Sequence, residues 1–376
     1  MTFAFTEEQQ ELRRGLRRFF EDKSSSQQVR RLMETDEGYD RAVWSQMAQQ
    51  LGLQGLTIPE EHGGAGGGPV EQLIVLEEMG RVLLCAPYFS TVCLAANAIM
   101  NAATDEQQGD LLPGIASGDT IAALAFTEPN GKWDASGITM EASGSGDSYT
   151  LDGTKMFVID GHTANQIVVV ARQSGTSGED GIGFFVVDGD ATGLTRTPLA
   201  TMDQTRKQAR LEFAGVSARP LGDVGRGWAA LSKTLDQAAV CLANEMVGGA
   251  QKVLDMSVEY AKVRVQFGRP IGSFQAIKHK CADMLLEVES GKSAAYYAAW
   301  AAAEDNDELP VVASLAKAYC SDAYFHAAAE NIQIHGGIGF TWEHDAHLYF
   351  KRAKASELLL GDPSTHREQM LKRIGI

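Results

Sequence analysis

Three stretches in the middle of the chain decide its fold class: SYTLDGTKMFVI at 148–159, QIVVVAR at 166–172 and IGFFVVD at 182–188. They are short, rich in β-branched and aromatic residues, and separated by Gly, Asp, Asn and Ser, which is typical of strands joined by turns. This pattern of short strand-like segments and turn residues extends from about Thr120 to Val224 and predicts an antiparallel β domain. Helical patterns precede and follow it, so we expect an α+β protein and not a βαβ repeat.

The flanking segments carry helical signals of their own. Near the start, Thr6 and Gln9 form a capping-box pattern ahead of apolar residues at helical spacing. The glycine-rich stretch IPEEHGGAGGGP at 58–69 lacks the GK[ST] of a P-loop, and it is either a connector or a ligand loop. We therefore predict an N-terminal helical domain, a central β domain and a C-terminal four-helix bundle, at 1–119, 120–226 and 227–376.

Composition excludes several classes of function. A net charge of −16 disfavours binding to nucleic acid or to anionic membranes. The five cysteines show no CxxC spacing, and the histidines show no HExxH-like spacing, so we expect a reducing compartment and no metal site. The first ten residues, MTFAFTEEQQ, lack signal-peptide features, and no uncharged apolar run approaches the roughly 20 residues that span a bilayer. We expect a cytoplasmic protein.

Four motifs occur in a fixed order: AFTEP at 125–129, VRVQFGRPIGSFQAIKHKCADM at 263–284, QIHGGIGF at 333–340 and LLGDPSTHRE at 359–368. Together they resemble the acyl-CoA dehydrogenase family over essentially the whole chain, including actinobacterial members that act on sterol side chains. The resemblance implies FAD held across a subunit interface, an acyl-CoA substrate and electron-transferring flavoprotein as the electron acceptor. It also implies a homodimer or homotetramer. Some sterol-type members consist of two different chains, so a heterotetramer with a paralogous chain stays open.

The second and third motifs supply candidates for the nucleotide part of the cofactor. We expect Arg264 on a helix just before Phe267, where a permanent cation can meet a pyrophosphate. Gln333 with Gly336 and Gly337 would complete the contact, because glycine lets backbone approach a ligand closely. In the family these motifs contact the FAD of the neighbouring subunit. The alternatives are a surface salt bridge for the arginine and a helix-ending turn for the glycines.

The resemblance places Phe126, Thr127, Trp133 and Phe157 at the flavin, with two departures from the family pattern. Lys132-Trp133 stands where many members have Gly-Ser, and Phe157-Val158-Ile159 stands where many have Trp-x-Thr. Loss of that threonine hydroxyl removes a hydrogen bond to the flavin. The alternative reading of Thr127 is a strand end before a proline.

One further cofactor candidate lies in the last motif. Asp362 replaces the threonine that the family usually places beside the cofactor. An aspartate can bind a ribose hydroxyl but would repel a pyrophosphate.

The reaction implied by the resemblance needs a carboxylate that takes the α proton while the flavin accepts the β hydride. The two positions that carry this base in the family fall on Leu360 and Ala238, which cannot accept a proton. Glu245 lies seven residues after Ala238, on nearly the same helical face and about 10 Å further along. We select Glu245 as the base. The alternative is a helix-boundary glutamate paired with a lysine or arginine.

The sequence thus predicts FAD-dependent α,β-dehydrogenation of an acyl-CoA thioester. Two alternatives to this prediction stay open. The first is a non-catalytic subunit that completes the FAD site of a partner chain. The second is a flavin oxidase or monooxygenase of the same fold.

Overall fold

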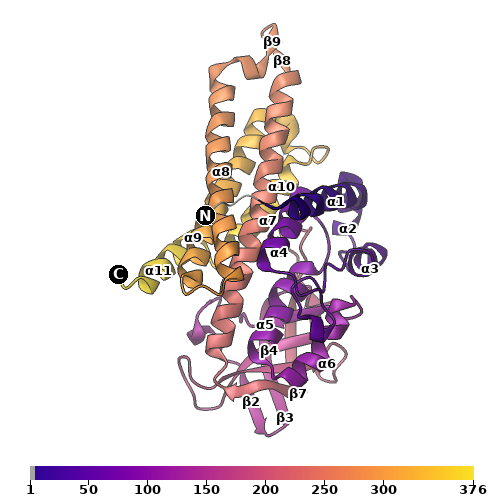
Figure 1. The fold of residues 1–376 in the computed structure, drawn as a ribbon, viewed down its shortest axis with the longest axis vertical. Coiled ribbons are helices and arrows are strands. Elements are labelled where there is room, and N and C mark those ends of the chain that lie inside the picture. Colours follow the sequence, from indigo (N-terminus) through magenta and orange to yellow (C-terminus); the bar gives the residue numbers. More distant parts are fainter. Residues whose placement is uncertain (1–4) are drawn as a thin grey trace. The chain divides into compact units, whose positions relative to one another are not determined.

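The computed structural model describes residues 5–376 and contains two compact units, each assembled from separate stretches of chain (Figure 1). Residues 1–4, which begin the segment predicted to lack a targeting signal, lie outside the described residues. The predicted order of helices, then strands, then helices is confirmed. The first unit combines Met1–Arg31, Pro69–Leu84 and Ala239–Ile376, and the second combines Leu32–Gly68 and Cys85–Ala238. The predicted domain boundaries at 119/120 and 226/227 stay a prediction.

The first unit is built from helices. Its N-terminal helix begins with the predicted capping box, in which the Thr6 side chain accepts the Gln9 N–H and the Gln9 side chain accepts the Thr6 N–H. The loop at 304–308, between two of the long C-terminal helices, lies mostly exposed at the surface. The helices of this unit are α1 (Glu7–Lys23), α4 (Pro69–Arg81), α7 (Trp228–Val263, from Ala239 onward), α8 (Gln275–Ala303), α9 (Leu309–His335), α10 (Ala346–Leu358) and α11 (Pro363–Arg373), and α2 (Ser26–Met33) begins in it.

Two glycines let α4 and α7 pack backbone against backbone. A Cβ added at Gly80 would lie 2.0 Å from the Glu245 carbonyl oxygen, and one added at Gly248 would lie 1.9 Å from the Glu77 carbonyl oxygen. Real Cβ atoms do not approach that closely, so each helix requires glycine where the other crosses it. This contact fixes the register of α7 against α4.

The second unit contains a mixed seven-stranded sheet within residues 5–376, in the order β1-β4-β2-β3-β7-β5, with β6 paired to β7. Most pairings are antiparallel, as predicted, whereas β1 and β2 each pair with β4 in parallel. Because β4 also pairs with β5, the sheet closes on itself. The strands are β1 (Ala122–Ala125), β2 (Glu141–Ser145), β3 (Ser148–Ile159), β4 (Gln166–Gln173), β5 (Ile182–Asp188), β6 (Leu194–Pro198) and β7 (Gln208–Gly225).

The core of this unit lies along β1, β4 and β5, whose residues are almost all buried. The glycine-rich stretch 58–69 folds as compact turns: a Cβ at Gly64 would lie 2.0 Å from the Ile58 carbonyl oxygen. Close packing within the chain therefore explains why glycine is needed in this stretch. The helices of the unit are α3 (Arg41–Gln49), η1 (Glu60–His62), the π-helix η2 (Phe89–Ala96), α5 (Asn97–Ala102), α6 (Asp105–Ala116) and η3 (Ala135–Gly137).

In the part of the chain that the structure describes, no helix is long and apolar enough to cross a membrane. The five cysteines are free, and four of them are buried.

The α4–α7 contact yields a stability prediction. We expect Gly248→Ala to lower the free energy of unfolding by about 1–3 kcal/mol, because the new methyl group overpacks the helix crossing. Urea unfolding measures the change. Gly15→Ala is the matched control: Gly15 lies in α1 with no atom within 4 Å of an added Cβ, so alanine there should stabilise by about 0.5–1 kcal/mol. Equal effects of the two variants would contradict the close contact.

Candidate functional site

The four residues predicted to face the flavin lie together in the second unit. Phe126 and Thr127 directly follow β1, and the Phe126 and Trp133 rings are 5.7 Å apart between centroids. The Met156 N–H donates to the Thr127 carbonyl at 2.8 Å. Because Phe157 is the residue after Met156, Thr127 lies close to Phe157 as well. Both Phe126 and Thr127 are buried, whereas Phe157 is 45% exposed. The structure therefore gathers all four candidates around one segment of the sheet and leaves one ring open to solvent.

A bulge in β3 presents the exposed ring. The register of β3 against β7 shifts between Lys155 and Val158, and Phe157 within it has a φ of 56°. A left-handed backbone is uncommon for a non-glycine residue and indicates that its surroundings hold it there. The bulge takes Phe157 out of the regular ladder and re-aims its side chain.

Two charged residues that the sequence analysis missed hold this segment. Glu128 and Lys155 form an ion pair of 2.7 Å, and both are buried. Burial acts to raise the pKa of Glu128, but the Lys155 charge and the hydrogen bonds to the carboxylate outweigh it and lower the pKa. Burial lowers the pKa of Lys155 to about 8 against the opposing charge of Glu128. The available signal was a lysine in strand β3 that keeps the alternation of the apolar residues Tyr149 and Leu151.

The prediction that Arg264 lies on a helix is wrong. Helix α7 ends at Val263, and Arg264 is the next residue. Its N–H still donates to the Tyr260 carbonyl at 2.9 Å, but its own carbonyl accepts the Ile271 N–H at 2.8 Å, which closes a hairpin. The hairpin consists of β8 (Val265–Gln266) and β9 (Arg269–Pro270).

The turn of this hairpin explains the Phe267-Gly268 pair. Both residues have positive φ, 53° and 77°. Two left-handed residues in succession are what a type I′ hairpin turn requires, and glycine satisfies this easily at the second position. The turn leaves the Phe267 side chain 91% exposed.

The glycine motif lies at the same end of the C-terminal helices. The Tyr260 ring, near the end of α7, stacks on the His335 ring, at the end of α9, with centroids 4.3 Å apart. Gln333, Gly336 and Gly337 are exposed, and an added Cβ would meet nothing within 4 Å at either glycine. The two predicted halves of the nucleotide contact are therefore brought to one end of the first unit.

This end of the helices carries the exposed groups that the sequence analysis predicts to contact the nucleotide. Arg264 is exposed, with no ion-pair partner among the described residues. At Gly337 the backbone is open to an incoming group. Two large apolar side chains that follow the glycine motif in the sequence are also exposed: Phe340 is 80% exposed and Trp342 is 60% exposed.

Glu245 lies in the middle of α7 and is paired with an arginine. Its carboxylate accepts from Arg352 of α10 at 2.6 Å, and both side chains are buried. The alternative reading, a paired glutamate, agrees with this contact, although the pair is not at a helix boundary as that reading supposed. Whether Glu245 is the base stays a prediction.

The loop between α10 and α11 holds the two other positions of interest. Leu360 is buried and has a φ of 63°. Asp362 caps α11 by accepting the Thr365 N–H at 2.7 Å, and this hydrogen bond lowers the pKa of Asp362. The carboxylate thus already has a structural role.

A buried lysine fixes this loop. Lys317 of α9 donates to the Ser321 hydroxyl and to the Glu357 and Gly361 carbonyls, each at 3.0 Å. Gln333 lies sixteen positions after Lys317 on α9, about 24 Å further along the helix axis. The structure therefore does not bring Asp362 to the nucleotide surface formed by Arg264 and Gln333 in the same chain.

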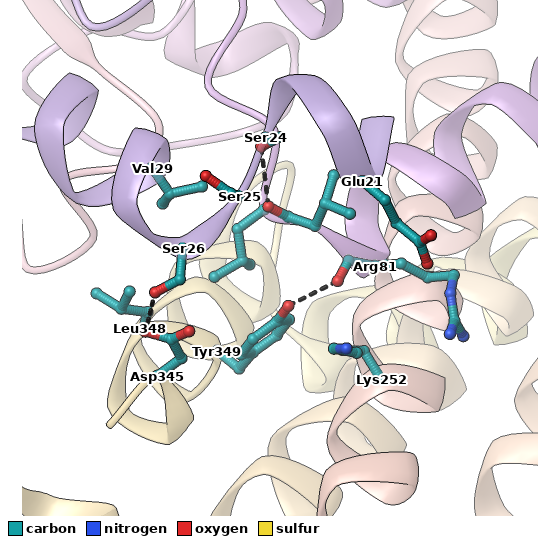
Figure 2. A pocket seen from close by; sticks show the side chains of 12 residues that line it. Glu21, Ser24, Ser25, Ser26, Val29, Arg81, Lys252, Asp345, Leu348 and Tyr349 are labelled. Atoms are coloured by element: carbon teal, nitrogen blue, oxygen red, sulfur yellow. Dashed lines mark hydrogen bonds between the residues drawn. The ribbon is translucent and has the colours of Figure 1, made fainter. Parts of the chain in front are cut away.

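A cavity of about 240 Å³ lies in the first unit, and none of the predicted site residues lines it. Figure 2 shows the side chains around it. Its wall mixes acids and bases, including Glu21, Arg81, Lys252 and Asp345. Existing hydrogen bonds already use much of its polar surface, since the Ser26 hydroxyl donates to Asp345 at 2.7 Å. The cavity therefore shares no lining residue with the candidate site.

Comparison with known proteins accounts for the whole chain. The family models of the acyl-CoA dehydrogenase N-terminal, middle and C-terminal domains match residues 6–119, 123–216 and 225–375. The chain is 37% identical to acyl-CoA dehydrogenase IpdE2 of Mycobacterium tuberculosis, over 98% of this chain and 96% of that protein.

Two solved structures extend the likeness to three dimensions. The Tcur3481–Tcur3483 steroid ACAD superposes with a TM-score of 0.88 at 33% identity, covering 98% of each chain. The ChsE4–ChsE5 complex of Mycobacterium tuberculosis superposes with a TM-score of 0.90 at 29% identity, covering 100% of this chain and 99% of that one.

The Lys317 site predicts a pH dependence of stability. Burial lowers the pKa of Lys317 from 10.5 to about 7, so between these values the unfolded chain binds more protons than the folded chain. The contribution of Lys317 should therefore grow as pH rises from 7, by roughly 1 kcal/mol for each pH unit. Urea unfolding of the wild type and Lys317→Met from pH 6 to 9 tests this, with the exposed Lys262→Met as control. A constant difference between wild type and Lys317→Met would refute it.

Proposed function

Because the chain belongs to the acyl-CoA dehydrogenase family, a family of FAD-dependent enzymes, we propose that it removes hydrogens from the α and β carbons of an acyl-CoA thioester with Glu245 as the base. The observation that carries the proposal is the grouping of the predicted cofactor residues into two clusters. One cluster contains Thr127 and Phe157, and the other contains Arg264 and Gln333. Each lies within one compact unit.

The first cluster fits a flavin ring and the second fits its nucleotide. Phe126, Thr127, Trp133 and Phe157 would hold the ring system. Arg264, Phe267, Gln333 and the Gly336-Gly337 backbone would hold the pyrophosphate side, contributed to the neighbouring subunit. When bound, FAD supplies the acceptor for the β hydride.

Glu245 would take the α proton. The Arg352 guanidinium at 2.6 Å favours the ionised carboxylate, which is the form that can accept a proton, and fixes its orientation. Burial of the pair excludes water from the carboxylate. Asp362 would serve the cofactor only through the backbone that it caps.

The same ion pair favours a second function. A guanidinium that stabilises the carboxylate also weakens it as a base, and the two positions that carry the base in the family are Leu360 and Ala238 here. In this second function the chain completes the FAD site of a paralogous chain that supplies the base. Two structural relatives carry the names of two chains, Tcur3481–Tcur3483 and ChsE4–ChsE5.

We further propose a steroid-derived acyl group as substrate and electron-transferring flavoprotein as acceptor. The name of one structural relative, a steroid ACAD, supports the substrate class, and the family resemblance supports the acceptor. The free, mostly buried cysteines agree with a cytoplasmic location.

A glutamine variant tests the base. Glu245→Gln should retain FAD, yet its flavin should be reduced by acyl-CoA at least about a hundredfold more slowly, because the substitution removes the proton acceptor. Anaerobic stopped-flow absorbance measures the rate. Glu78→Gln is the matched control: Glu78 is also buried and paired with an arginine, Arg17, at 2.6 Å, but it has no proposed role in the reaction. Near-normal reduction in Glu245→Gln would remove Glu245 from the mechanism.

The colour of the purified chain separates the two functions. For a self-sufficient dehydrogenase we expect a yellow protein whose flavin bleaches on anaerobic addition of a steroid-ring acyl-CoA, and less with butyryl-CoA. Absorbance at the flavin band measures both. A colourless chain that gains flavin and activity only on mixing with a paralogous chain would establish the second function instead.

A further inference from the structure

One buried ion pair beside the candidate flavin cluster has no part in the proposed reaction. Glu128 and Lys155 lie in the second unit, at side-chain exposures of 3% and 0%. We propose that they are positioning residues for the cofactor: the pair holds the Phe126–Thr127 segment and the Phe157 bulge in the arrangement that receives the flavin.

Glu128 is fully engaged within the chain. Its carboxylate accepts the N–H groups of Thr139 and Met140, each at 3.0 Å, the Thr139 hydroxyl, and the Lys155 ammonium at 2.7 Å. These bonds tie Glu128, and with it the neighbouring Thr127, to the segment that leads into β2. A carboxylate with its oxygens filled in this way anchors its own backbone and has no capacity for a ligand.

Lys155 connects the same segment to β3. Its ammonium donates to the Phe126 carbonyl at 3.3 Å as well as to Glu128. The next residue, Met156, donates its N–H to the Thr127 carbonyl at 2.8 Å. The residue after that is Phe157, with its left-handed backbone. One lysine therefore sets the spacing between Thr127 and the exposed ring.

The position of the pair argues against a role in stability alone. A buried ion pair is weak support for stability, because desolvation of two charges offsets their attraction. Lys155 of this pair also lies at the edge of the β3 bulge, where regular pairing with β7 is lost. Buried polar groups that hold a strained, exposed backbone segment, such as the Phe157 bulge, are typical of ligand-binding sites.

The test compares Lys155→Met with Leu151→Ala. Leu151 lies four residues earlier on β3 and is fully buried, but it takes no part in the hydrogen bonds of residues 126–128. We expect Lys155→Met to weaken FAD binding by roughly tenfold or more, as loss of about one charge-assisted hydrogen bond would, and to alter the visible circular dichroism of bound flavin. Leu151→Ala should lower Tm at least as much yet bind FAD within about twofold of wild type.

Amide hydrogen exchange extends the test to protein without cofactor and without turnover. In Lys155→Met the Met156, Thr139 and Met140 amides should exchange faster. Glu128→Gln, which replaces one of the two acceptor oxygens with an NH₂ donor, should speed exchange at Thr139 and Met140 as well. The proposal fails if Lys155→Met keeps wild-type FAD affinity and exchange, or if Leu151→Ala loses both in proportion to its Tm. These readouts are independent of Glu245 and of the substrate.

Discussion

The close crossing of α4 and α7 is the constraint on which the helical unit depends. Gly80 and Gly248 allow the two backbones to touch, and a side chain at either position would force the other helix to shift. Because α7 continues from this contact to the hairpin after Val263, its register also sets where that hairpin begins. Glu245 lies three residues before the crossing glycine, which determines that it faces Arg352 of α10. The backbone contact and the buried ion pair therefore lie within one turn of each other on α7.

Much of the fold could be predicted because it rests on local patterns. The capping box of α1, the strand texture of 120–224 and the exposed loop that follows α8 are all short-range signals. The closeness of the candidate flavin residues follows from AFTEP and the β3 strand, whose sequences carry the family resemblance. The end of α7 was not predictable. Periodicity continues through Arg264, and the Ile271 N–H that takes its carbonyl comes from a hairpin that periodicity does not describe.

The partners of the buried charged residues also could not be predicted from the sequence, because tertiary contacts bring them together. Lys155 meets Glu128 because two strands and a bulge bring them together across 27 residues, and Arg352 meets Glu245 across 107. A lysine or glutamate in an apolar run signals only that some partner exists. Lys317 shows how misleading that signal can be, since its hydrogen-bond acceptors are a hydroxyl and two carbonyls and not a carboxylate.

The hairpin at the end of α7 has a consequence for handling the protein. Phe267 projects almost entirely away from its own chain, and the family resemblance assigns it to a neighbour's cofactor. A prosthetic group clasped by two molecules is retained only while they stay associated, so its occupancy follows mass action. Dilution would then strip flavin from a chain whose every internal contact is intact, and the yellow colour would report concentration as much as folding.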